Sequence, residues 1–269
     1  MKQHTPCLNI LKRISALKHL LLLRPTAASL LTNVTLILVG KEPANISLHN
    51  GIKICAPKNL PLLEIISEIF TYKVYTPINL RIAPNDIVLD IGANIGIFSL
   101  FASLNTRNLI YAFEPFTENI KYIKKNAKKN LANNIIINEY AISGRTDIMN
   151  LSLTRNPAGN ILYTKDLKKS EKTSVDVLSK TLEQIMEENN LKQIDFLKMD
   201  CEGSEGDIFM STSKQYLRRI KKISLEFHDN VSVLNHHQIQ QVLKNADFST
   251  WLNWNGMGPF GYIYGINLK

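Results

Sequence analysis

From Asp86 onward, short apolar runs rich in β-branched residues alternate with stretches of helical pattern. The apolar runs predict buried strands at Ile87 to Gly92, Leu109 to Glu114, Ile135 to Tyr140, Ile194 to Asp200 and Ile223 to His228, with two last strands that end at Gly261 to Leu268. The other stretches predict helices at Ile97 to Leu104, Thr117 to Asn130, Leu182 to Asn189, Gly206 to Leu217 and Ile239 to Ala246. Alternation over about 180 residues predicts an α/β fold with a doubly wound, mostly parallel sheet.

The segment from residue 147 to residue 175 departs from this alternation. Its pattern is irregular, and we expect a hairpin at Ile148 to Thr154 and a charged loop at Lys165 to Lys172. Ligands of a doubly wound sheet bind at the carboxyl ends of its strands. We therefore look for chemistry at the strand ends.

The first 80 residues are organised differently. Between Leu8 and Leu23, leucine and isoleucine recur at three- and four-residue spacing with bases between them, which predicts an amphipathic helix that Pro25 ends. The next elements are a second apolar stretch at Ala27 to Val39, a hairpin at Ile46 to Ile54 around an Asn-Gly turn, and a helix at Leu62 to Phe70. We therefore divide the chain into a helical and hairpin extension, residues 1–80, and an α/β domain, residues 81–269.

The net charge of +9 is unevenly distributed along the chain. Six bases and no acid fall within residues 1–41, so the rest of the chain carries a net charge of only +3. The basic helix either packs on the main domain with its bases solvated, which we favour, or lies on an anionic membrane surface or on another subunit. The charge-free window from Pro25 to Gly40 is shorter than the roughly 20 apolar residues that a membrane span needs.

Composition narrows the class of protein further. A hydrophobic content of 45% excludes a disordered chain. The three cysteines are widely spaced, which suggests neither a disulfide framework nor a zinc site and favours a reducing compartment. We expect a cytoplasmic protein, with residues 1–41 as the candidate for peripheral membrane contact.

A glycine-containing turn follows the first strand of the α/β domain. It consists of Asp90, Gly92, Asn94 and Gly96 with apolar residues between them. Glycines at a strand-to-helix turn let a ligand approach the backbone, but the dinucleotide motif has glycine where Asp90 stands. A carboxylate repels a pyrophosphate and attracts a cation. The turn therefore favours an adenosine ligand that is positively charged and lacks a diphosphate, as S-adenosylmethionine does.

The second strand ends in an acid, Glu114, which lies 24 residues after Asp90. Nucleotide-binding folds place an acid at this separation to accept hydrogen bonds from the ribose hydroxyls. The structural alternative is an acid that stabilises the first turn of the helix opened by Pro115. The glycine-containing turn at Asp90 and an acid at this separation from it together favour the ribose role for Glu114.

Two acids and a histidine end the fourth and fifth strands. Asp200 and Glu202 follow the fourth strand, and His228 ends the fifth. Glu202 or His228 could take a proton from an acceptor, while Asp200 holds the donor or positions the acceptor. If side chains alternate strictly along the strands, Lys198 and Glu226 point to the face opposite that of their strand neighbours, unless the strand ends bend. The two carboxylates could instead bind a divalent cation, but two side chains are few ligands for such an ion, and we expect no metal.

From about Ile46 to Lys269, the chain resembles the FkbM family of S-adenosylmethionine-dependent methyltransferases. The resemblance is carried, in the family's order, by DIGANIG, AFEP, NEYAIS (Asn138 to Ser143), DFLKMDCEGSE (Asp195 to Glu205) and LEFH. It implies a class I methyltransferase fold, with a seven-stranded sheet whose last strand is antiparallel. It also implies O-methylation of a hydroxyl on a sugar, glycan or secondary metabolite.

The resemblance also implies roles for individual residues. Asp90, Gly92, Asn94 and Gly96 would line the methionine end of the cofactor, Glu114 the ribose and Ala141 the adenine, while Asp200, Glu202 and His228 would face the acceptor. Two features depart from the family. Gly144 and Arg145 replace the acid that often follows the third strand, and residues 1–41 match nothing in the family.

Three other functions are weighed against this one. A nucleotide-dependent oxidoreductase is the nearest rival enzyme, and Asp90 argues against it. A nucleic-acid methyltransferase is disfavoured because Asn156-Pro157 is followed by Ala158-Gly159 instead of proline and an aromatic residue, so we expect a small-molecule or glycan acceptor and no nucleic acid. A non-catalytic binding module with the same fold remains the third alternative.

Overall fold

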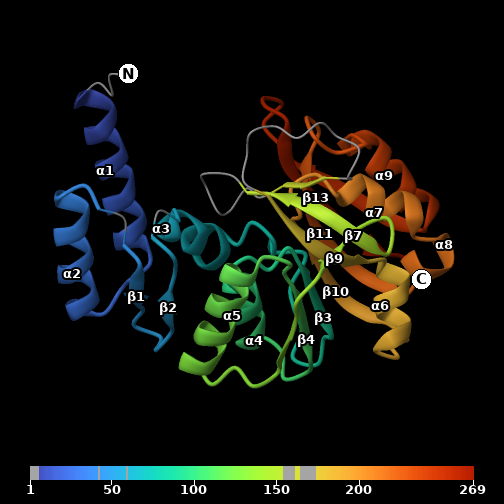
Figure 1. The fold of residues 1–269 in the computed structure, drawn as a ribbon, viewed down its shortest axis with the longest axis horizontal. Helices are drawn as coiled ribbons and strands as arrows, with labels where there is room; N and C mark the ends of the chain where they lie inside the picture. Colours follow the sequence, from blue (N-terminus) through green and yellow to red (C-terminus); the bar gives the residue numbers. More distant parts are fainter. Residues whose placement is uncertain (1–5, 42, 59, 154–160, 164–173) are drawn as a thin grey trace.

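The computed structural model describes residues 6–41, 43–58, 60–153, 161–163 and 174–269. At its centre is a seven-stranded sheet in the order β12-β13-β11-β10-β3-β4-β5 (Figure 1). The strands are β3 (Val88–Ile91), β4 (Ile110–Phe113), β5 (Ile135–Asn138), β10 (Ile194–Met199), β11 (Ile220–His228), β12 (Phe248–Asn253) and β13 (Phe260–Asn267). β13 is antiparallel to β11 and β12, whereas the pairs from β11 to β5 are parallel. The predicted doubly wound fold with an antiparallel last strand is confirmed.

Successive side chains of the central strands enter different hydrophobic cores. Val88 of β3 and Phe196 of β10 pack in one core with Phe98 of α4 (Ile97–Ser103). Leu89 and Leu197, the next residues on the same strands, pack in the other core with α6 (Leu182–Glu188), α7 (Glu205–Ser211) and α9 (His236–Asn245). Because strand side chains alternate between faces, the continuous apolar runs cover both sides of the sheet.

The segment that we expected to be irregular belongs to a second, four-stranded sheet, which corrects that expectation. Its strands are β6 (Ala141–Ile142), β9 (Ser174–Lys180), β7 (Asp147–Ser152) and β8 (Ile161–Tyr163), in that order across the sheet. The segment expected to form a hairpin at Ile148 to Thr154 instead supplies one strand, which pairs with β9 and β8. These partners lie far along the chain, so a local pattern does not show them. The predicted charged loop at Lys165 to Lys172 lies outside the described residues.

Three predicted helices differ from those of the structure. The helix predicted at Leu62 to Phe70 is a shorter helix, α3 (Leu62–Ile66), which continues as a π-helical turn, η1 (Ser67–Tyr72). The stretch from Gly206 to Leu217 forms α7 and a separate α8 (Lys214–Leu217). The last helix starts earlier than predicted, at His236, because Asn235 and Gln238 form a capping box there.

The N-terminal extension lies at one end of the molecule (Figure 1). It contains α1 (Pro6–Leu22), α2 (Ala27–Leu38) and the predicted hairpin, formed by β1 (Asn45–Ser47) and β2 (Lys53–Cys55). Leu20 and Leu23 are buried in the core shared with β3. Asn126 of α5 (Thr117–Lys129) accepts a hydrogen bond from the backbone N–H of Cys55 at 2.9 Å and donates to the carbonyl oxygens of Cys55 and Ile95 at 3.0 Å. This side chain joins the hairpin to the loop before α4.

The first two helices also present apolar side chains to solvent. These side chains recur at helical spacing along each helix, and the largest are Leu11, Ile14 and Leu21 on α1 and Leu31 and Leu38 on α2. Lys12, Arg13 and Lys18 of α1 are exposed as well. Within the part of the chain that the structure describes, no helix combines the length and the apolar character that crossing a membrane requires.

Candidate active site

The loop between β3 and α4 forms the floor of the site. Gly92, Asn94 and Gly96 adopt positive φ values of 74°, 51° and 82°. A Cβ atom on Gly92 would overlap the carbonyl oxygen of Asp200, because the loop packs directly against the end of β10. Glycine is therefore required at this position for its conformation and for its lack of a side chain.

Asp90 lies beneath this loop. Its fully buried carboxylate accepts a hydrogen bond from Ser99 Oγ at 2.6 Å and forms an ion pair with Lys198 Nζ at 3.2 Å. Lys198 also donates to the carbonyl oxygen of Gly92 at 2.8 Å. Its expected orientation, opposite that of its strand neighbours Leu197 and Met199, is confirmed, because those two side chains pack in the core on the other face while Nζ lies 3.8 Å from Asp200 Oδ2. The long side chain reaches the carboxyl end of the sheet, where it holds the loop in place.

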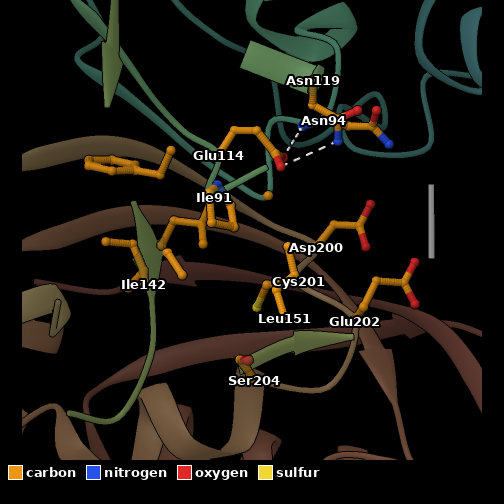
Figure 2. Close-up of a pocket in the computed structure, with 14 residues that line it drawn as sticks. Ile91, Asn94, Glu114, Asn119, Ile142, Leu151, Asp200, Cys201, Glu202 and Ser204 are labelled. Carbon is orange, nitrogen blue, oxygen red and sulfur yellow. Dashed lines mark hydrogen bonds between the residues drawn. The ribbon is translucent and has the colours of Figure 1, made fainter. Parts of the chain in front are cut away.

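A cavity of about 600 Å³, partly open to solvent, lies over the loop (Figure 2). The residues singled out from the sequence that line it are Gly92, Asn94, Glu114, Ala141, Asp200 and Glu202, whereas Asp90, Gly96 and His228 do not. Apolar side chains complete the wall: Ile91, Phe113, Ile142 and Leu151. An apolar wall facing a group of carboxylates suits a ligand with a flat ring at one end and polar or cationic groups at the other.

Glu114 is held in this cavity by a set of hydrogen-bond donors. Its carboxylate accepts from the backbone N–H groups of Asn94 and Phe116, each at 2.9 Å, and from Asn119 Nδ2 at 3.3 Å. Burial raises the pKa of Glu114 to about 7, although these hydrogen bonds oppose the rise. Asn119 Oδ1 has no hydrogen-bond partner among the described residues, and Asn119 lines the cavity.

A second cavity, of about 820 Å³, lies between the extension and the loop. Its lining is rich in acids: Glu64, Glu68, Asp200, Glu202 and Glu226. Tyr75 Oη lies 2.8 Å from Asp200 Oδ2 and 3.0 Å from Glu226 Oε2, and its single hydroxyl proton is shared between the two carboxyl groups. Glu226 points away from its strand neighbours Leu225 and Phe227, which pack in the core on the other face, so its expected orientation is confirmed. Burial and the charge of Asp200 raise the pKa of Glu68 to about 7 and that of Glu226 to about 8.

The two cavities meet at a shared set of residues. Gly92, Asn94, Asp200 and Glu202 line both of them. Asn94 and Glu202 are both non-glycine residues at positive φ, of 51° and 53°. Strained backbone of this kind persists where the surrounding structure imposes it, and it concentrates at functional sites. A ligand in one cavity can reach a ligand in the other at this junction.

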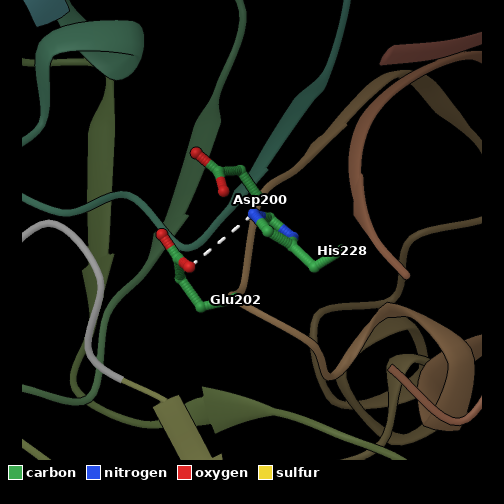
Figure 3. A group of neighbouring side chains, drawn as sticks. All are labelled: Asp200, Glu202 and His228. Atoms are coloured by element: carbon green, nitrogen blue, oxygen red, sulfur yellow. Dashed lines mark ion pairs between the residues drawn. The ribbon is translucent and has the colours of Figure 1, made fainter. Parts of the chain in front are cut away.

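The imidazole of His228 points toward the carboxylates of Asp200 and Glu202 (Figure 3). Its Nδ1 lies 3.2 Å from Glu205 Oε1, and its Nε2 lies 3.6 Å from Glu202 Oε2. Glu205 is fully buried and also accepts from the backbone N–H groups of Cys201 and Gly203. Burial lowers the pKa of His228, but the hydrogen bond to Glu205 and the surrounding carboxylates raise it more, to about 10.

The pKa values of two groups next to His228, those of Glu202 and Cys201, are also raised. Burial and the charge of Asp200 raise the pKa of Glu202 to about 7, against the opposing effect of His228. Burial and the charge of Glu205 raise the pKa of the Cys201 thiol well above its usual range. The thiol therefore stays protonated, and Cys201 is not a reactive nucleophile.

The described geometry agrees with what comparison with known proteins finds. The family model of the methyltransferase FkbM domain matches residues 90–250, which is more than half of the chain. The chain belongs to the FkbM methyltransferase family. The matched segment begins at Asp90 and includes the glycine loop, Glu114, both acids after β10 and His228.

Three named relatives show the extent of the similarity. The 31-O-demethyl-FK506 methyltransferase FkbM of Streptomyces tacrolimicus is 25% identical over 190 residues, which are 60% of this chain and 73% of that protein. The methyltransferase sdnD of Sordaria araneosa is 26% identical over 213 residues, which are 68% and 81% of the two chains. The antimetabolite synthetase AmbE of Pseudomonas aeruginosa is 27% identical over 201 residues, 61% of this chain but only 9% of AmbE.

A solved FkbM structure has the same fold. The crystal structure of the methyltransferase FkbM from Methylobacillus flagellatus KT superposes with a TM-score of 0.51 at 13% sequence identity. The superposition covers 96% of this chain and 60% of that one. At this identity, the likeness concerns the fold alone.

Several residues of this FkbM site were missed from the sequence. Tyr75, Glu68 and Glu226 reach the second cavity, and Asn119 and Glu205 support the first cavity and the junction. Tyr75 and Glu68 come from the extension, far from any motif. Glu205 carries the clearest signal, since it is the last acid of the DFLKMDCEGSE motif, one turn after Glu202.

Proposed function

We propose that this FkbM-family methyltransferase transfers a methyl group from S-adenosylmethionine to a hydroxyl of a sugar, glycan or secondary metabolite. The observation that carries the proposal is the junction of the two cavities at Gly92, Asn94, Asp200 and Glu202. Methyl transfer needs a donor and an acceptor held in line at one point. A cofactor cavity and an acceptor cavity with a common wall provide that arrangement.

The 600 Å³ cavity fits the cofactor. Glu114 has oxygen atoms to accept hydrogen bonds from ribose hydroxyls, and Asn119 Oδ1 is a buried acceptor to which no group in the described part of the chain donates. Ala141 and Ile142 offer an apolar surface for the adenine ring. When bound, S-adenosylmethionine supplies an electrophilic methyl group on a positively charged sulfur. The carboxylates of Asp200 and Glu202 favour that charge at the junction.

The 820 Å³ cavity fits an acceptor that carries hydroxyl groups. Carboxylates accept hydrogen bonds from several donors at once, and Glu64, Glu68 and Glu226 surround the space next to the junction. The acceptor hydroxyl must lose its proton as the methyl group arrives. Because Asp200 and Glu202 line both cavities and His228 lines neither, we assign activation of the hydroxyl to the two carboxylates. The name of the Streptomyces relative, an O-methylating enzyme, supports a hydroxyl acceptor.

Calorimetric titration of the purified chain with S-adenosylhomocysteine and, separately, with NAD tests the cofactor. We expect S-adenosylhomocysteine to bind and NAD not to bind, because the pyrophosphate of NAD would face the carboxylates of Asp200 and Glu202. Binding of NAD alone would sink the proposal. Incubation with cell extract and S-adenosylmethionine labelled on the methyl group, followed by identification of the labelled product, then tests the acceptor class.

We also propose that the extension holds the enzyme on an anionic membrane surface. The support is the row of exposed apolar side chains on α1, which includes Leu11, Ile14 and Leu21, beside the exposed bases Lys12 and Lys18. Apolar groups that enter the lipid boundary and bases that meet anionic headgroups act together at such surfaces.

A further inference from the structure

The side chains of Asp200 and Glu202, which line both cavities, point toward that of His228 (Figure 3). Each offers one ligand atom, and the three atoms lie within 4.8 Å of one another. We propose that these three side chains bind one divalent cation of the first transition row, with Mn²⁺ as its representative, and that the cation activates the acceptor hydroxyl. The sequence alone suggested two carboxylates, and the fold adds the nitrogen ligand that they lacked.

The orientation of His228 is that of a metal ligand. The residue is only 9% exposed, and Glu205 occupies its Nδ1 at 3.2 Å. A carboxylate on one ring nitrogen fixes the ring and directs the other nitrogen outward, as it does behind metal-bound histidines. Nε2 is 3.6 Å from Glu202 Oε2, which is too long for a hydrogen bond. Nε2 therefore points at the two carboxylates without a hydrogen bond to either of them.

The spacing suits two ligands on one ion. Ligands at right angles on a cation with bonds of about 2.1–2.3 Å lie roughly 3 Å apart, and opposite ligands lie a little more than 4 Å apart. The 3.6 Å between Nε2 and Oε2 falls between these values. Small side-chain rotations are enough to bring the atoms to bonding distance, since Asp200 and Glu202 have side chains that are 26% and 29% exposed.

Charge favours a cation at this point. Asp200, Glu202 and Glu205 place three carboxylates around one imidazole. Lys198 forms an ion pair with Asp90 at 3.2 Å and donates to the carbonyl oxygen of Gly92 at 2.8 Å, and it lies farther from Asp200, at 3.8 Å. Tyr75 occupies Asp200 Oδ2, which leaves Oδ1 for the ion.

The ligand set narrows the choice of ion. One imidazole nitrogen with two carboxylate oxygens suits a transition cation better than Mg²⁺ or Ca²⁺, which prefer oxygen alone. Three protein ligands leave coordination positions open for water or an acceptor oxygen. Coordination needs a neutral Nε2, so the proton that Nε2 otherwise carries leaves to solvent.

The cation would supply the hydroxyl activation that the proposed function assigns to Asp200 and Glu202, and the inference rests on that function. The acceptor oxygen would bind the ion, which lowers the pKa of the hydroxyl, and its proton would pass to solvent. The oxygen lone pair would then form a bond to the methyl carbon while the carbon–sulfur bond breaks and its electrons stay on sulfur. Glu202 would act as a ligand in this step.

Mn²⁺ titration of the chelator-treated, full-length chain tests the site, with free Mn²⁺ followed by electron paramagnetic resonance. We expect one ion per chain. Asp200→Asn, Glu202→Gln and His228→Gln should each weaken binding by about ten-fold or more. Glu118→Gln and His237→Gln, at exposed positions outside the cavities, should bind as the wild type does. Circular dichroism identifies any variant that fails to fold.

A second measurement uses the wild-type chain alone. Pulsed resonance of the Mn²⁺-loaded protein should detect coupling to a histidine nitrogen. Absence of Mn²⁺ binding, absence of that coupling, or binding that all three variants leave unchanged overturns the proposal. S-adenosylhomocysteine binding in the same samples separates the two hypotheses. Binding of the product without Mn²⁺ would overturn only the cation site. Binding of Mn²⁺ without the product would overturn the proposed methyl transfer.

Discussion

At the scale of single residues, the proposed function makes Glu114 the residue that holds the cofactor. Its carboxylate is buried, and its charge is compensated by donors from the loop and from α5. Glu114→Gln keeps the shape and removes the charge, so affinity for S-adenosylhomocysteine should fall by roughly 10- to 100-fold, the range expected for lost hydrogen bonds to a charged group. Calorimetric titration measures the change. Glu139→Gln, at an exposed position, is the matched control.

Glu114 also predicts a pH dependence of cofactor binding. Burial raises its pKa to about 7 in the free chain, and hydroxyls that donate to the ionised carboxylate lower the pKa in the complex. Because the ionised form binds better, affinity should rise roughly ten-fold between about pH 6 and pH 8, with proton release on binding at the lower pH. Titration in buffers of different ionisation enthalpy measures that release. The dependence should disappear in Glu114→Gln, and its persistence would contradict the assignment.

At the scale of elements, the contact between the glycine loop and β10 predicts the effect of a single methyl group. In Gly92→Ala the new Cβ would overlap the backbone of Asp200, and we expect loss of product binding and a melting temperature lower by roughly 4–8 °C. Gly51→Ala is the matched control, since Gly51 also has a positive φ but open space around it. Equal effects of the two substitutions would show that conformation alone, without the overlap, explains the loss.

Elements with a strong local signal could be predicted from the sequence. The central strands are continuous apolar runs that are buried on both faces, and this pattern depends on neighbours along the chain. The second sheet was missed because β7 pairs with β9, in which Leu178 is exposed and Ser179 is buried, so that the alternation of burial does not appear as an alternation of apolar and polar residues. The π-helical turn η1 was also missed, since its residues have an ordinary helical pattern.

The site was predictable to the extent that it sits at strand ends. Glu114, Asp200 and Glu202 line the cofactor cavity because parallel strands bring their carboxyl ends to one edge. Alternation predicted that Lys198 and Glu226 point away from their strand neighbours, but it did not predict that these long side chains reach the same edge from within the strands. Tyr75 could not be predicted, because only the packing of the extension brings it to Asp200.

At the scale of the whole molecule, the exposed apolar row of α1 predicts membrane association. Replacing Leu11, Ile14 and Leu21 together by glutamine should reduce binding to anionic phosphatidylserine vesicles by about ten-fold or more, because the apolar surface that enters the lipid is lost. Co-sedimentation measures the effect. Ile78→Gln, at an exposed position outside α1 and α2, should leave binding unchanged. Equal binding of the triple variant and the wild type would contradict the membrane proposal.

The two cavities have different origins along the chain. The walls of the cofactor cavity lie within residues 90–250, whereas Pro61, Glu64, Glu68 and Tyr75 of the acceptor cavity precede that segment. Asn126 joins the two parts through backbone groups of Cys55 and Ile95, which do not depend on the side chains that face the acceptor. Under the proposed function, exchange of the N-terminal part would replace one wall of the acceptor cavity and leave the cofactor cavity unchanged, so a chimaera made at this boundary would take part of its acceptor site from one parent and its whole cofactor site from the other.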